Sequence, residues 1–160
     1  MKLGVISDTH LKAYDKKLEA VVEKYFSDAD IILHAGDIVD LGVLGVFGGK
    51  TLYAVCGNMD LASIRNSFPY KQVLEIKGHS IGLIHGWGTP HNIEEKLIRE
   101  FDTIDCLVYG HTHMAVNHKK DNVLFFNPGS PTDRMFASNN TVGIIEIGDT
   151  ITGKIIEVTD

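Results

Sequence analysis

Residues 2–10 read KLGVISDTH, a short apolar run that ends in an acid and a histidine. Three further runs share this character, because each is short, rich in β-branched or aromatic residues, and bounded by Gly, Asp or His: ADIILHA (29–35), TLYAVC (51–56) and CLVYG (106–110). Near-continuous apolar runs of this length are typical of strands buried on both faces of a parallel sheet. The four segments therefore predict the parallel sheet of an α/β protein.

Two segments have the spacing of amphipathic helices. DKKLEAVVEKYF (15–26) places Leu18, Val21, Val22, Tyr25 and Phe26 at helical intervals. A crossover helix is therefore expected between the first two strands. A second helix is expected over HNIEEKLIREF (91–101), opened by Thr89-Pro90.

The remaining segments favour antiparallel β structure. KQVLEIKGHSIGLIHG (71–86) predicts a hairpin that turns at Lys77-Gly78-His79. The last third contains three runs of strong β composition, NVLFFN (122–127), TVGIIEI (141–147) and TGKIIEV (152–158), and a polar loop, SPTDRMFASNN (130–140). One α/β domain over residues 1–160, with a parallel and an antiparallel part, is the economical prediction.

Composition restricts the functional class. The formal net charge is −6, with acidic and basic residues interleaved, which disfavours extended nucleic-acid binding. The two cysteines, Cys56 and Cys106, end or begin apolar runs, as buried free thiols of a reducing cytoplasm do. No signal peptide and no apolar stretch of about 18 residues is found, so we expect a soluble cytoplasmic protein without a membrane span.

Polar residues with metal-ligating groups follow five of the predicted strands: Asp8 and His10, Asp37, Asn58, His85, and His111 with His113. Loops at the carboxyl edge of an α/β sheet converge on one crevice, so these residues are expected to meet there. Three oxygen donors and four imidazoles form a nitrogen and oxygen set that suits Mn, Fe, Zn, Co or Ni. Seven donors exceed the needs of one tetrahedral ion and suffice for two, provided that one carboxylate bridges.

Each of these residues also has a structural interpretation. Asp8 and Asp37 could cap a helix or a turn, and Asn58 after Gly57 is a common turn pair. Taken singly, these interpretations are the better ones, whereas the joint occurrence at five strand ends favours metal binding. His34 is expected to be a satisfied core group, and His79 and His118 to be exposed, while His91 is a weak candidate for a substrate contact.

With these residues placed, the chain resembles the calcineurin-like metallophosphoesterases, and within them the small bacterial and archaeal phosphodiesterases. The matching blocks span nearly the whole chain in the family's order: SDTH (7–10), GD (36–37), GNMD (57–60), HG (85–86), GHTH (110–113) and NPGS (127–130). The resemblance implies a four-layer αββα sandwich of two mixed β-sheets flanked by helices. It also implies a dinuclear centre at the carboxyl edge of the sheets.

The resemblance assigns each ligand to an ion. Asp8, His10 and His113 would hold one ion, Asn58, His85 and His111 the other, and Asp37 would bridge them. Two divalent ions are implied, with Mn²⁺ expected and Ni²⁺, Zn²⁺ or Fe as alternatives. A metal-bridging hydroxide would attack phosphorus, and Asp37, Asn58 and His85 are the expected catalytic residues because the last two could also orient phosphate oxygens.

Three further residues are weaker candidates near the substrate. Many larger relatives carry histidine where this chain has Met59, and a thioether cannot protonate a leaving oxygen. Asp60 is a speculative substitute for that acid, although a helix cap explains it equally well. Arg134 is a candidate clamp for a substrate phosphate, and NPGS is expected to have a structural role close to the metal loops.

Two functions of different classes follow. The first is a metal-dependent phosphodiesterase acting on a small-molecule phosphodiester, with a homo-oligomeric state left open. The second is a non-catalytic protein-binding scaffold of the same fold, as in the retromer coat. All seven ligand positions hold competent ligand types, which favours the enzyme. A nuclease acting on long DNA ranks lower, because the chain has no basic stripe.

Overall fold

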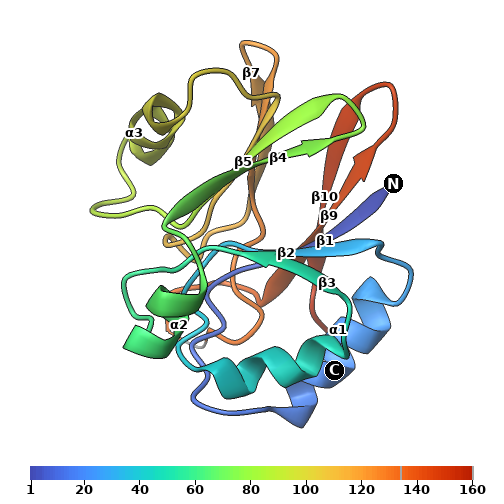
Figure 1. Cartoon of the computed structure of the whole chain (residues 1–160), viewed down its shortest axis with the longest axis vertical. Coiled ribbons are helices and arrows are strands. Elements are labelled where there is room, and N and C mark those ends of the chain that lie inside the picture. The colour runs from blue at the N-terminus through green and yellow to red at the C-terminus, as the bar shows by residue number, and fades with distance from the viewer. Residues whose placement is uncertain (134, 160) are drawn as a thin grey trace.

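The computed structural model describes residues 1–133 and 135–159 and contains two five-stranded sheets (Figure 1). The first has the strand order β10-β9-β1-β2-β3, and the second has the order β4-β5-β6-β8-β7. The strands are β1 (Lys2–Ile6), β2 (Ile31–His34), β3 (Thr51–Ala54), β4 (Lys71–Ile76), β5 (His79–Ile84), β6 (Cys106–Val108), β7 (Val116–Lys120), β8 (Val123–Asn127), β9 (Thr141–Ile147) and β10 (Ile151–Glu157). The helices are α1 (Lys16–Phe26), α2 (Ala62–Ser67), α3 (Ile93–Leu97) and the 3₁₀ helices η1 (Leu41–Phe47) and η2 (Ile98–Glu100).

Both sheets are mixed. In the first sheet β1, β2 and β3 pair in parallel, whereas β9 and β10 add antiparallel strands beside β1. In the second sheet β5, β6 and β8 are parallel, and β4 and β7 close the two edges in antiparallel pairing. The predicted parallel sheet is therefore confirmed for the first three apolar runs, but the fourth run, β6, lies in the other sheet.

The alternation of apolar side chains along the strands creates three cores and hence four layers. Leu33 and Val108 belong to the cluster between the two sheets. Their neighbour Ile32 instead packs with α1, α2 and η1 on the outer face of the first sheet. Leu107 packs with α3 and η2 on the outer face of the second sheet. The expected four-layer αββα sandwich is confirmed.

The crossover helix α1 shows how the sequence builds one of these layers. Asp15 caps its N-terminus by accepting hydrogen bonds from the backbone N–H groups of Lys17 and Leu18, each 2.9 Å long. Its buried face carries Phe26, which packs directly over Gly4 of β1, where a Cβ would lie 2.7 Å from the Phe26 ring. The glycine in KLGVIS therefore allows the helix to approach the sheet closely.

Local structure differs from the prediction in several loops. The predicted helix over 91–101 is shortened to α3 and η2, because Asn92 has a left-handed backbone with φ 54° and the helix begins after it. The elements η1, α2 and β7 were not predicted. The hairpin turn is confirmed, with φ of 50° at Lys77 and 79° at Gly78. Among the described residues, no helix has the length and apolar character to cross a membrane.

Candidate metal centre

The seven expected ligands all lie just after strand ends, at the edge where the two sheets meet. Asp8 and His10 follow β1, Asp37 follows β2, Asn58 follows β3, His85 follows β5, and His111 and His113 follow β6. Side-chain contacts of 3.1–3.9 Å connect all seven into one cluster. The structure thus brings together every metal ligand that the sequence suggested, from both sheets.

The backbone at this cluster is strained. Five of the seven residues have left-handed φ angles, namely Asp8 (53°), His10 (49°), Asp37 (56°), His111 (69°) and His113 (58°). Such angles are uncommon outside glycine and cost roughly 1–2 kcal/mol per residue. Strain of this kind concentrates at functional sites, where the surrounding fold enforces it. The turns that follow the strands therefore point these side chains inward at a cost in stability.

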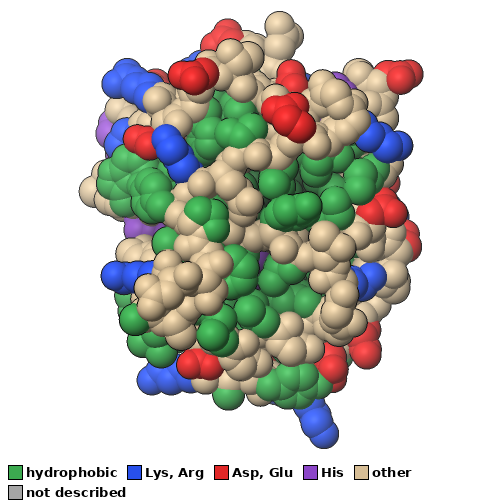
Figure 2. Space-filling view, in the orientation of Figure 1, with side chains coloured by type: hydrophobic (Ala, Val, Ile, Leu, Met, Phe, Trp, Pro, Cys, Tyr) green, Lys and Arg blue, Asp and Glu red, His purple; other side chains and the backbone are tan. Residues whose placement is uncertain are grey.

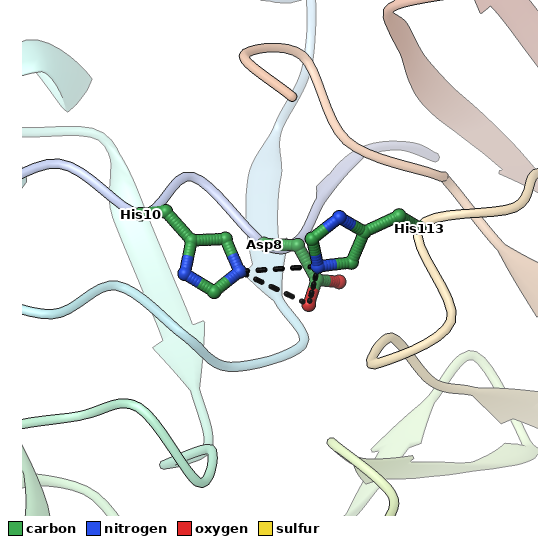
Figure 3. A group of neighbouring side chains, drawn as sticks. All are labelled: Asp8, His10 and His113. Atoms are coloured by element: carbon green, nitrogen blue, oxygen red, sulfur yellow. Dashed lines mark hydrogen bonds and ion pairs between the residues drawn. The ribbon is translucent and has the colours of Figure 1, made fainter. Parts of the chain in front are cut away.

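One group of three side chains converges on a buried carboxylate oxygen (Figure 3). The Nε2 atoms of His10 and His113 lie 3.1 Å apart, and Asp8 Oδ1 lies 3.7 Å from the former and 3.3 Å from the latter. Asp8 Oδ1 is buried and has no hydrogen-bond partner within residues 1–133 and 135–159. An unpartnered buried carboxylate oxygen that faces two imidazole nitrogens fits a divalent cation, because such an atom is otherwise costly to bury.

Asp37 lies between this group and the next. Its Oδ2 is 3.5 Å from His10 Nε2 and 3.3 Å from His85 Nε2, while its Oδ1 accepts a 2.8 Å hydrogen bond from the Met59 backbone N–H. Asp8, Asp37 and His85 also offer ligand atoms within 4.8 Å of one another. One carboxylate oxygen of Asp37 is thus placed between two groups of nitrogen donors, as a bridging ligand requires.

The second group consists of Asn58, His85 and His111. Asn58 Oδ1 lies 3.1 Å from His85 Nε2 and 3.1 Å from His111 Nδ1. His85 donates its Nδ1–H to the carbonyl of Ala35 at 2.7 Å, and His111 donates its Nε2–H to the carbonyl of Gly88 at 2.8 Å. A carbonyl oxygen can only accept a hydrogen bond, so the ring nitrogen that contacts it carries the proton. The other ring nitrogen of each histidine then has its lone pair toward the cluster.

The acidic groups of the cluster remain ionised. Burial alone would raise the pKa of Asp8, but the close imidazoles of His10 and His113 hold that pKa well below its ordinary value. Burial likewise opposes ionisation of Asp37, and the contact with His85 more than offsets it, so the pKa of Asp37 is also lowered. The close approach of the Asp8 carboxylate raises the pKa of His113 to about 9. The cluster therefore presents two carboxylates that are charged at neutral pH.

The NPGS block (127–130) donates hydrogen bonds to the loops that carry the expected metal ligands. Asn127 Nδ2 donates to the carbonyl of Gly110 at 2.9 Å, and Ser130 Oγ donates to the carbonyl of Asp8 at 2.7 Å. The side-chain carbonyl of Asn127 also accepts the N–H of Gly129 at 2.9 Å. The expected structural role of NPGS close to the metal loops is confirmed.

Asp60 has a different role from the substrate contact suggested by the sequence. Its side chain is buried, and its two oxygens accept backbone N–H groups of Asp37 (3.1 Å), Val39 (2.5 Å) and Gly57 (2.6 Å). Both carboxylate oxygens are therefore occupied as acceptors by the backbone, and Asp60 does not line the cleft over the expected ligands. We therefore correct the assignment: Asp60 connects the Asp37 loop to the Gly57 loop. It does not cap α2, and it is not a substrate contact.

The remaining predicted residues are separate from the cluster or lie outside the described part. His91 is exposed and does not line the cleft over the metal cluster. Arg134 lies outside the described residues. His34 is fully buried, with Nδ1 accepting the Gly36 N–H at 3.2 Å and Nε2 lying 3.2 Å from Thr9 Oγ1, so it is a satisfied core group as predicted.

A cleft of about 710 Å³ opens over the cluster. Expected metal ligands form one part of its lining, and Met59, Met135 and Phe136 contribute apolar side chains that are 57%, 83% and 73% exposed. Residues 130–140 were expected to form a polar loop, and their contribution to this apolar side of the cleft was not predicted. The dipeptide Met135-Phe136 was the available signal, because two large apolar side chains in a polar loop need a partner or a ligand.

Comparisons with known proteins agree with the geometry. A family model described as the calcineurin-like phosphoesterase superfamily domain matches residues 1–150. A probable metallophosphoesterase of Methanocaldococcus jannaschii is 38% identical over 139 residues, which cover 82% of this chain and 69% of the relative. The solved structure of an archaeal phosphodiesterase matches 99% of this chain and 100% of its own, with a TM-score of 0.79 and 25% identity.

A second type of structural neighbour shares the fold alone. Vps29 of Chaetomium thermophilum matches with a TM-score of 0.77 over 99% of this chain and 97% of its own, at 18% identity. The family match over most of the chain and the relative above 30% identity are the stronger findings. They establish that this chain belongs to the calcineurin-like phosphoesterase superfamily.

Proposed function

We propose that the protein is a metal-dependent phosphodiesterase that hydrolyses a small phosphodiester at a dinuclear centre. The observation that carries the proposal is the buried Asp8 Oδ1, which has no hydrogen-bond partner in the described residues and faces the Nε2 atoms of His10 and His113. Such an arrangement is costly without a cation. His10 and His113 line an open cleft, which would give a small substrate access to an ion held by this group.

The proposed ligand assignment follows the contacts. Asp8, His10 and His113 hold one ion, Asn58, His85 and His111 hold the other, and Asp37 Oδ2 lies between the two groups. The nitrogen and oxygen donor set suits Mn²⁺, Ni²⁺, Zn²⁺ and Fe alike, and the family resemblance favours Mn²⁺. Two such cations supply Lewis acidity toward phosphoryl oxygens and lower the pKa of a water molecule toward neutrality.

The chain's own groups would orient the phosphodiester. Asn58 lines the cleft and offers its Oδ1 to the cluster, and no acceptor for its Nδ2 is found in the described part of the chain. That amide is therefore available to donate to a phosphoryl oxygen. Asp37 and His85 would fix the position of the reacting groups, since both are almost fully buried and have defined hydrogen-bond partners.

The leaving group receives less help from the protein. Met59 lines the cleft at the position where larger relatives carry histidine, and its thioether cannot donate a proton. Asp60 is bound to three backbone N–H groups and does not replace that acid. Phosphodiesters whose leaving oxygen departs without protonation, such as aryl esters, are therefore expected to react fastest.

The size and charge of the surface favour a small substrate. A cleft of about 710 Å³ lies within the range of small-molecule sites, roughly 300–1,000 Å³. On the face shown in Figure 2, Lys and Arg side chains are scattered among Asp and Glu and form no continuous stripe. With a net charge of −6, this distribution does not favour the backbone of a long nucleic acid.

A protein-binding scaffold is the second candidate, because structures of Vps29 share the fold. Metal removal followed by restoration separates the two. The protein should be stripped with a chelator, given Mn²⁺, Ni²⁺, Zn²⁺, Fe²⁺ or Mg²⁺ separately, and assayed with bis(p-nitrophenyl) phosphate beside p-nitrophenyl phosphate. We expect turnover of the diester to disappear on chelation and to return with at least one transition metal.

The metal content decides how a negative result is interpreted. If two ions bind per chain and neither ester is hydrolysed with any of the five metals, the enzyme proposal is wrong and the scaffold is favoured. If the monoester is hydrolysed and the diester is not, the substrate class is wrong although the dinuclear centre stands. Metal content and turnover should be measured on the same protein samples. A circular dichroism spectrum of each sample should confirm that the protein is folded.

The two histidines of GHTH are predicted to serve different ions. His111→Ala should lower the affinity for the ion shared with Asn58 and His85. His113→Ala should lower the affinity for the ion shared with Asp8 and His10. Loss of a supporting partner of a ligand costs about 10–100-fold in affinity, so loss of the ligand should cost at least as much. Calorimetric titration with Zn²⁺ should show one weakened ion in each variant. Weakening of the same ion by both substitutions would refute the division.

A further inference from the structure

The loop after NPGS places a carboxylate against the outer side of His113. Asp133 Oδ2 lies 2.5 Å from His113 Nδ1, and the Asp133 side chain is 6% exposed. The two residues are twenty positions apart, in different loops. A carboxylate accepts but does not donate when ionised, so this contact places a proton on His113 Nδ1.

The opposite nitrogen of the same ring faces the metal cluster. His113 Nε2 is 3.3 Å from Asp8 Oδ1 and 3.1 Å from His10 Nε2 (Figure 3). The imidazole is thus held between Asp133 on one side and the ligand atoms on the other. His85 and His111 are held in the same manner, but by the neutral carbonyls of Ala35 and Gly88.

Asp133 is itself fixed by the loop in which it lies. Its carboxylate accepts backbone N–H groups of Met135 (2.8 Å), Phe136 (3.2 Å) and Ala137 (3.0 Å). Its backbone is also held, because Ser130 Oγ accepts the Asp133 N–H at 3.0 Å and Asn140 donates to its carbonyl at 2.6 Å. The acceptor for His113 is therefore in place before any ligand binds.

We propose that Asp133 is the positioning residue of His113: it fixes the ring orientation and directs the Nε2 lone pair to the ion shared with Asp8 and His10. A carboxylate partner of a metal-binding histidine fixes the tautomer and increases the basicity of the ligand. Asp133 does not touch the substrate in this role. The inference rests on the proposed dinuclear centre, but its test measures metal binding and is independent of phosphodiester turnover.

Two substitutions of Asp133 should lower Zn²⁺ affinity to different extents. Asp133→Asn keeps one oxygen that can accept the His113 Nδ1–H, but it removes the charge and places an NH₂ where Oδ1 now accepts the Met135 N–H. Asp133→Ala removes the charge and both acceptors. Competition of the stripped protein with a chromophoric chelator for Zn²⁺ should show that Asp133→Ala weakens one of two ions by about 10–100-fold. Asp133→Asn should lie between Asp133→Ala and wild type. The exposed Asp149→Asn is a matched control and should leave both affinities unchanged.

A double substitution separates positioning from general support of the loop. If Asp133 acts through His113, Asp133→Ala should cause no further loss of Zn²⁺ affinity in a His113→Ala background. An undiminished additional loss in that background would mean that the loop acts on the site by another route, and the proposal would be wrong.

The ring proton provides a spectroscopic readout of the same contact. In the Zn²⁺-loaded protein, the Nδ1–H of His113 should give a downfield proton resonance that exchanges slowly with water, assigned by its absence in His113→Ala. The resonance should be lost in Asp133→Ala and should shift in Asp133→Asn. Persistence of an unshifted resonance in Asp133→Ala, together with wild-type Zn²⁺ affinity, would overturn the proposal.

Discussion

Asp37→Asn is expected to abolish diester hydrolysis, with a loss of turnover of at least about 10³-fold, and to lower the affinity for both ions. The substitution preserves the shape of the side chain, and the single amide oxygen can still accept the Met59 N–H that now bonds to Asp37 Oδ1 at 2.8 Å. The amide NH₂ would then occupy the position of Oδ2, near His10 Nε2 and His85 Nε2. A donor in that position repels a cation, and a bridging ligand should matter more than a supporting partner, whose loss costs about 10–100-fold in affinity.

The measurement is turnover of bis(p-nitrophenyl) phosphate, with metal content determined by mass spectrometry on the same sample. Asp149→Asn is the control, because this exposed aspartate lies in the turn after β9. Its activity and metal content should match those of wild type. If Asp37→Asn retained two ions with unchanged affinity, Asp37 would not be the bridging ligand.

Gly57→Ala is expected to cost about 10²-fold in activity, although residue 57 carries no chemical group for the reaction. A Cβ at this position would overlap Asp37 Oδ1 and would lie 2.6 Å from the Asp37 backbone N. Neither atom can move freely, because Oδ1 accepts the Met59 N–H and the Asp37 N–H is bound by Asp60. The Asp37 carboxylate must therefore shift, and a misplacement near 1 Å can reduce catalysis by about 10²-fold.

The same substitution should lower the free energy of unfolding by about 1–3 kcal/mol, as overpacking does. Gly148→Ala is the matched control, because a Cβ there meets nothing within 4 Å and the backbone φ is not in the left-handed region. Its free energy of unfolding should stay within about 0.5 kcal/mol of wild type. Wild-type turnover and metal content in Gly57→Ala would show that the Asp37 carboxylate tolerates displacement, contrary to the bridging role.

The strands and the candidate metal ligands could be predicted from the sequence, because both depend on residues that are close together in the chain. An apolar run such as KLGVIS specifies a buried strand by its own composition, and the polar residues after it, Asp8 and His10, must lie at the end of that strand. The hairpin at Lys77-Gly78 was likewise predictable, because glycine permits the backbone angle that the turn requires. Each inference used residues that are close together in the chain.

Residues that act through distant partners were not accessible in this way. Asp60 appeared to be a helix cap or a proton donor, but its three partners are backbone N–H groups of two loops that meet only in the folded chain. Asp133 lay in a segment treated as a polar loop, and its partner His113 is twenty positions away. Neither contact has a periodicity or spacing that a sequence pattern could show.

The sequence by itself determined that buried strands end in side chains of metal-ligating type, because strand formation and the chemistry of each side chain are properties of short segments. The tertiary structure decided that β1, β2 and β3 lie in one sheet and β5 and β6 in the other, so that the ligands meet where the two sheets adjoin. It also decided which carboxylate bonds to which partner, as with Asp37, Asp60 and Asp133. Those choices depend on the packing of apolar faces between layers, which involves residues far apart in the chain.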